Sequence, residues 1–136
     1  MWEHFHHQAD IGIRGTGETL DQAFAEGAMA LTAVVCDPLK VQAAECVEII
    51  CQGDDPEYLF FDWISAIIYE MDIRKMLFGR FEVTIDGSQL RAKAWGESID
   101  ADRHDIAVEV KAATFMLLKV YQDPEERWVT QCVVDV

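Results

Sequence analysis

The chain has 136 residues, a length suited to one domain that buries roughly 68% of its unfolded surface. Half of its residues are apolar, a composition that excludes wholesale disorder. Eleven basic residues against 25 acidic ones give a formal charge of −14, and such a surface repels phosphates, which argues against direct, high-affinity RNA binding.

The first regular elements in chain order are a strand and a helix. ADIGIRGTG alternates isoleucine with glycine and arginine, which predicts a strand that ends at Gly15 or Gly17. Apolar residues then recur at helical spacing over residues 20–35, with Thr19 placed to cap the helix. Pro38 cannot continue this helix and should end it.

A second strand and a second helix follow. ECVEIICQG predicts a strand with one apolar face, and Asp55 and Pro56 then supply an N-cap and a first helical residue. The helix that they begin carries a thick apolar stripe and must lie against a sheet. The stripe consists of Phe60, Ile64, Ile67 and Met71, widened by Phe61 and Ile68.

The C-terminal half is predicted to be mostly strand. FEVTIDGSQLRAKAWGE reads as a hairpin that turns at Asp86-Gly87, and residues 107–122 and 127–136 read as two long strands. Two long helices and about six strands indicate an α+β fold. We therefore expect a single domain over residues 1–136, with both helices on one face of a mostly antiparallel or mixed sheet.

The four cysteines form no CxxC pair and no zinc-finger spacing. Cys46, Cys51 and Cys132 lie in apolar, strand-like stretches, where a free cysteine behaves as a small buried hydrophobe. The sequence shows no signal-peptide pattern, and its longest apolar run is too short to span a bilayer. We expect a soluble, cytoplasmic protein with reduced thiols and no membrane partner.

The segment HFHHQAD raises the question of a transition-metal site. In an uninterrupted extended segment, His4, His6 and Asp10 share a face and His7 points the other way. These positions span too far to converge around zinc without a bend. We therefore interpret the segment as a polar arm with one structurally fixed histidine.

The terminal VVDV offers a different kind of metal chemistry. Asp135 and the α-carboxylate of Val136 supply adjacent oxygen donors, and Asp10 would add a third carboxylate if its strand lay beside them. Three carboxylates suit a hard cation such as calcium or magnesium. Spacing alone, however, favours a solvated acidic terminus in so acidic a chain.

Two further groups of charged residues stand out. Lys111 follows Glu109 by two positions in an apolar, strand-like stretch, so it is either paired with that carboxylate or functional. Arg103 and His104 lie in a polar loop, where a surface role is the favoured interpretation. A small-molecule hydrolase would need them to converge with Glu97 in a pocket. No nucleophile motif supports that alternative, so we expect that this protein is not an enzyme.

Taken together, these stretches resemble the archease family. The matching pieces keep their order from "HQADIGIRGTGETLDQAFAEGAMALTAVVCD" through "LFFDWISAIIYEMD" and "MLFGRFEV" to "AWGES", "DRH", "EVKAATF" and "CVVDV". The resemblance implies a protein cofactor of the RNA-splicing ligase RtcB, which joins cyclic- or 3′-phosphate RNA ends to 5′-hydroxyl ends. The cofactor would promote guanylylation of the ligase and allow multiple turnover.

The resemblance also implies roles for individual residues. Asp10, Asp135 and the carboxylate of Val136 match positions that bind a divalent cation, typically calcium. Lys111 matches a functionally important lysine, and His7 matches a histidine with a supporting role. The main alternative is a general metal-binding or chaperone-like interaction module with no ligase role.

Overall fold

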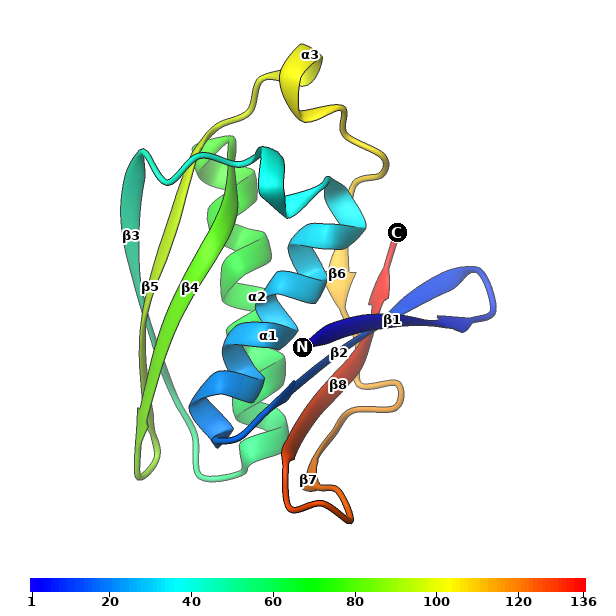
Figure 1. Cartoon of the computed structure of the whole chain (residues 1–136), viewed down its shortest axis with the longest axis vertical. Coiled ribbons are helices and arrows are strands. Elements are labelled where there is room, and N and C mark those ends of the chain that lie inside the picture. Colours follow the sequence, from blue (N-terminus) through cyan, green and yellow to red (C-terminus); the bar gives the residue numbers. More distant parts are fainter.

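The computed structural model describes all 136 residues and contains two antiparallel sheets with two long helices between them (Figure 1). The five-stranded sheet has the order β1-β2-β8-β6, and β7 also pairs with β8. Its strands are β1 (Trp2–His7), β2 (Asp10–Gly17), β6 (Ala112–Ala113), β7 (Lys119–Gln122) and β8 (Trp128–Asp135). The three-stranded sheet has the order β3-β5-β4, formed by β3 (Glu45–Gln52), β4 (Met76–Asp86) and β5 (Gln89–Ser98).

The helices begin where their capping residues stand. The Thr19 hydroxyl accepts from the Gln22 N–H at the start of α1 (Leu20–Val35), and the Asp55 carboxylate accepts from the Glu57 N–H at the start of α2 (Pro56–Arg74). Each bond satisfies a backbone donor that the first helical turn leaves free. The short elements are a 3-10 turn, Pro38–Lys40, and α3 (Ala101–His104). Both predicted helices and both caps are confirmed.

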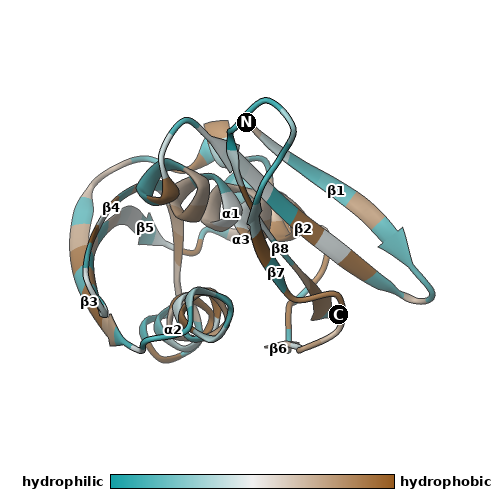
Figure 2. Cartoon of the chain, turned by 90° about the horizontal axis from the view of Figure 1, so that it is seen from below, coloured by the Kyte–Doolittle hydropathy of each residue, from teal (hydrophilic) through white to brown (hydrophobic).

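Helix α1 is bound from both sides. On one side the Thr130 hydroxyl of β8 donates to the Ala23 carbonyl at 2.8 Å, and on the other the Thr32 hydroxyl donates to the Phe78 carbonyl of β4 at 2.7 Å. Figure 2 shows α1 between the two sheets, with α2 beside it. The helices therefore share one core of 27 buried residues with both sheets.

The α+β class is confirmed, but the strands form two sheets where one was predicted. Local alternation identifies a strand without specifying its partner, so the split between sheets leaves no mark in the periodicity. The long strand predicted over residues 107–122 is wrong, because only β6 and β7 pair with β8 there. Between them the chain turns, with Leu117 at a left-handed φ of 53°.

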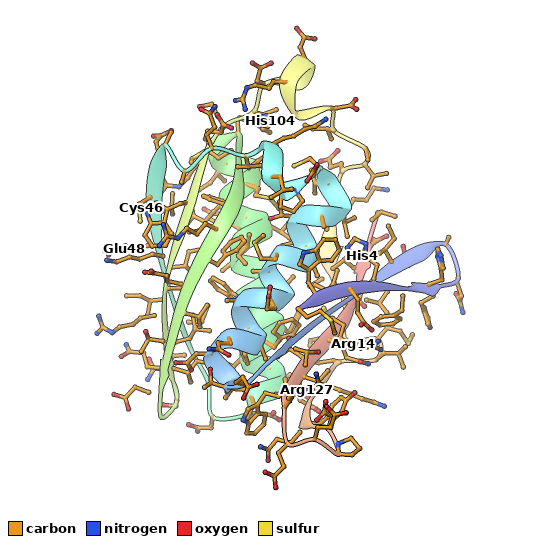
Figure 3. The ribbon with its side chains drawn as sticks, in the orientation of Figure 1. His4, Arg14, Cys46, Glu48, His104 and Arg127 are labelled. Carbon is orange, nitrogen blue, oxygen red and sulfur yellow. The ribbon has the colours of Figure 1, made fainter.

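Two smaller observations complete the comparison with the sequence. All four cysteines are free, but Cys46 is exposed on β3, whereas Cys51 and Cys132 are buried as expected. The side chain of Cys46 belongs to the outward-facing row of that strand (Figure 3). None of the helices combines the length and the apolar character that a transmembrane helix requires.

Candidate functional site

One corner of the five-stranded sheet gathers residues from both ends of the chain. Strand β2 starts at Asp10, β8 ends at Asp135, and the two strands pair antiparallel up to Ile11 opposite Val134. The main-chain N–H of Val136 then donates to Oδ1 of Asp10 at 3.4 Å. The sheet thereby brings Asp10, Asp135 and Val136 together, although 124 residues lie between the two aspartates in the sequence.

Lys111 lies at the same corner through its backbone. Its N–H donates to the Asp135 carbonyl at 2.8 Å, one residue before β6 pairs Ala112 with Asp135. The prediction of a lysine enclosed in an apolar strand is wrong, because Lys111 and Glu109 are both exposed in an irregular segment and form no ion pair. Pairing with Glu109 therefore does not account for Lys111.

His7 also lies opposite Asp10, contrary to the expectation that it would point away. Residues 8 and 9 form a turn, with Gln8 at a left-handed φ of 56°, and the resulting hairpin pairs His7 with Asp10. Directly opposed residues of an antiparallel pair lie on the same face of the sheet. The turn supplies the bend that an uninterrupted segment lacks.

His4 is held against α1 and not at this corner. The ring Nε2 of His4 hydrogen-bonds the Ala30 carbonyl at 2.8 Å, which makes His4 the structurally fixed histidine of the arm (Figure 3). No group of three or more His, Cys, Asp or Glu side chains is placed to hold a metal ion. The corner contributes two side-chain carboxylates, from Asp10 and Asp135, plus the terminal carboxylate of Val136. These are oxygen donors, which suit calcium or magnesium better than zinc.

A second polar cluster lies beneath α3. His104, predicted to be a surface residue, is fully buried, and its Nε2 contacts a Glu97 carboxylate oxygen at 2.9 Å (Figure 3). Its Nδ1 receives the Asp100 N–H at 2.9 Å, so Nδ1 is unprotonated and Nε2 carries the proton donated to Glu97. Arg103 donates to the other oxygen of Glu97 and to the Lys40 carbonyl.

This cluster is built to hold the chain in place. The hydrogen bond from Arg103 is the largest of the effects that lower the pKa of Glu97 from 4.5 to about 2, followed by hydrogen bonds from the Gln42 N–H and from His104. Glu97 is therefore an anion at neutral pH and cannot serve as a general acid. None of Glu97, Arg103 and His104 lines either of the two main cavities. The residues of the hydrolase alternative converge, but in a hydrogen-bonded network that lies outside both of these cavities.

Known proteins match this chain over nearly its whole length. The family model described as Archease protein family (MTH1598/TM1083) matches residues 2–136. The chain is 40% identical over 140 residues to Protein archease from Pyrococcus furiosus, covering 100% of this chain and 99% of that protein.

Two solved structures share the fold. The solution structure of protein 1598 from Methanobacterium thermoautotrophicum superposes with a TM-score of 0.88 at 30% identity, covering 99% of this chain and 98% of that one. The crystal structure of an archease from Thermotoga maritima, described as a possible chaperone, gives a TM-score of 0.65 at 22% identity, covering 100% and 98%. At that identity, the second likeness bears on the fold alone.

Proposed function

This chain belongs to the archease family, and from that membership we propose that it is a non-catalytic protein cofactor of the RNA-splicing ligase RtcB. In this role it promotes guanylylation of the ligase and so permits repeated turnover on RNA ends with a cyclic or 3′-phosphate. The observation that carries the proposal is the family match over residues 2–136, with 40% identity to a relative over its whole length.

The proposal includes a divalent-cation site at Asp10, Asp135 and the carboxylate of Val136. The hydrogen bond from the Val136 N–H to Asp10 supports this site, because the bond holds the last residue of the chain beside Asp10 without the help of an ion. Calcium best matches a set of oxygen donors with net negative charge, and a bound cation would relieve repulsion among three carboxylates. Lys111 and His7 flank this set and are proposed as residues that act toward the partner.

The charge of the protein also fits a protein partner. An RNA ligase must present basic surface to its substrate, and a chain with a formal charge of −14 is complementary to such a surface. Electrostatic attraction of this kind accelerates association and orients the two proteins. It would bring an acidic corner toward the nucleotide site of the ligase without direct RNA binding by this chain.

A turnover assay tests the proposal. Limiting ligase from the same organism is mixed with GTP, divalent metal and excess cyclic-phosphate RNA, with or without this protein. Without this protein we expect the ligase to stop after a single turnover. With the protein present we expect the ligase to continue through further turnovers. Glu48→Gln, an exposed acid on β3 far from the corner, should stimulate as well as the unmodified chain (Figure 3).

The opposite result would redirect the functional assignment. If an active ligase gains no turnover from this protein, the cofactor role fails. The general metal-binding or chaperone-like interaction module then becomes the better account of the same fold.

A further inference from the structure

Strand β1 directs alternate side chains to opposite faces of its sheet. His4 faces α1, because its Nε2 lies 2.8 Å from the Ala30 carbonyl oxygen. Phe5 and His7 therefore lie on the face that is turned away from this helix. The hairpin that β1 forms with β2 projects from the side of the molecule (Figure 1). The face that carries Phe5 and His7 is thus distinct from the face that packs on α1.

Phe5 packs on Gly12 directly beside the proposed cation site. The two residues are paired across β1 and β2, and the next pair on the same face of the hairpin is His7 with Asp10. A Cβ atom at position 12 would lie 2.2 Å from both Cε2 and Cζ of the Phe5 ring. The ring therefore occupies the space that any larger side chain would need, and this contact depends on glycine at position 12.

Arg14 holds the same ring from the adjacent row of the sheet. Its guanidinium carbon lies 4.7 Å from the centroid of the Phe5 ring, which is a cation–π contact. The guanidinium also forms an ion pair with Glu3 of β1, and its Nε donates to Oε1 of Gln131 in β8 at 3.0 Å. Through Gly12 and Arg14, the Phe5 ring is therefore tied to the two strands that lie beside β1.

The tip of the hairpin has few other side-chain anchors. The side-chain hydrogen bonds nearest to the tip are those of His4 and Asp10, and Phe5 is the packed ring between them. Asp10 is the first residue of β2, and its Oδ1 accepts from the Val136 N–H at 3.4 Å. The path of the hairpin therefore decides how closely Asp10 approaches the end of the chain.

We propose that Phe5, seated on Gly12, is a positioning residue for the proposed cation site. The ring fixes the hairpin on the sheet, so that Asp10 stays beside Val136 and His7 stays on the same face. Residues that surround a set of metal ligands fix the orientation of those ligands and so raise the affinity for the ion. This inference rests on the cation site of the proposed function, and it assigns a role to a residue that supplies no ligand.

The amide of Val136 reports the geometry of the corner without any metal, because its acceptor is Asp10. Nuclear magnetic resonance spectra of the full chain compare Phe5→Ala and Gly12→Ala with the unmodified protein and with Asp10→Ala. We expect both variants to move the Val136 amide resonance towards its position in Asp10→Ala and to speed its hydrogen exchange. Trp2→Ala removes an aromatic side chain from the opposite face of the same strand and should leave this resonance in place.

Titration of the same proteins with calcium chloride, without ligase, measures the consequence for the ion. We expect Phe5→Ala and Gly12→Ala each to weaken calcium binding about tenfold. The double variant should lose no more affinity than either single variant, because both substitutions act through the same ring. Trp2→Ala should bind calcium as tightly as the unmodified chain does.

Three results would overturn the positioning role and leave the cation site in place. They are an unmoved Val136 resonance with unchanged calcium affinity in Phe5→Ala, additive losses in the double variant, and an equal loss in Trp2→Ala. Absence of calcium binding by the unmodified chain would instead reject the cation site, and the positioning role with it. Ligase turnover is measured separately, so each of these results leaves the cofactor role to its own assay.

Discussion

The main-chain N–H of Val136 lies 3.4 Å from Oδ1 of Asp10 and donates a hydrogen bond to it, which joins residues 126 positions apart. This bond makes the last strand and the first hairpin a single structural corner. Asp10 therefore has a structural role as a hydrogen-bond acceptor beside its proposed role as a charged metal ligand. An asparagine at this position tests the two roles separately, because it keeps the acceptor oxygen and loses only the negative charge.

Asp10→Asn should therefore preserve the fold and weaken calcium binding at least about tenfold, because calcium affinity depends on the charge of its oxygen ligands. Asp135→Asn should have the same effect. Isothermal titration calorimetry with calcium chloride at low ionic strength measures both variants, and Glu48→Gln is the matched control on a distant strand. Unchanged calcium affinity in the Asp10 and Asp135 variants would contradict the proposed cation site at this corner.

Glu97 should make the protein sensitive to acid. Its pKa is lowered from 4.5 to about 2 in the folded state, so the unfolded chain takes up the proton first as the pH falls. The stabilisation is complete above about pH 4.5 and is lost between there and about pH 2. Urea denaturation from pH 7 to pH 3 should show a shallower loss of stability in Glu97→Gln than in the unmodified chain. Parallel curves would mean that other carboxylates dominate acid unfolding.

The cysteines should differ in reactivity according to burial. Burial raises the pKa of Cys51 to about 11 and that of Cys132 to about 12, and it also raises the pKa of Cys36. Cys46 alone is exposed. We expect a thiol reagent at pH 8 to modify one cysteine rapidly in the native protein and all four in denaturant. Rapid native labelling in Cys46→Ser would contradict this assignment.

Gly15 should resist substitution because β2 and α1 touch at this point. A Cβ atom at position 15 would lie 2.1 Å from the Gly27 backbone nitrogen, whereas one at Gly53 would meet nothing within 4 Å. Gly15→Ala should lower the free energy of unfolding by about 1–3 kcal/mol or more. Gly53→Ala should stay within about 0.5 kcal/mol of the unmodified chain. Chemical denaturation measures both, and equal stabilities would mean that the contact relaxes without cost.

The sequence predicts the parts of this fold whose signals are local. Thr19, Asp55 and Pro56 mark the helix starts, and Asp86-Gly87 marks the hairpin, because caps and turns depend on a few neighbouring residues. Periodicity alone does not predict the number of sheets, because that depends on pairing between strands distant in the chain. The same limit explains why the prediction of one long strand over residues 107–122 is wrong. In this range only β6 and β7 pair with β8.

The candidate corner is a mixed case. Sequence patterns single out the carboxylates, and they predict a cation site only if the strand of Asp10 lies beside the C-terminus. The pairing of β2 with β8 is what brings Asp10 to Val136. The turn that places His7 opposite Asp10 carries no glycine, asparagine or proline to signal it. The sequence does not predict the burial of His104, because its partner, Glu97, comes from the preceding strand and the local polarity indicates an exposed loop.

Guanylylation of the ligase is the measurement that tests the central claim most directly. Ligase, divalent metal and GTP labelled at the α-phosphate are incubated with the unmodified protein, with Asp10→Asn or with Glu48→Gln, and the label attached to the ligase is followed over time. The account predicts faster and more complete labelling with the unmodified protein and with Glu48→Gln, and no stimulation by Asp10→Asn. Labelling that is the same with and without this protein would contradict the cofactor role.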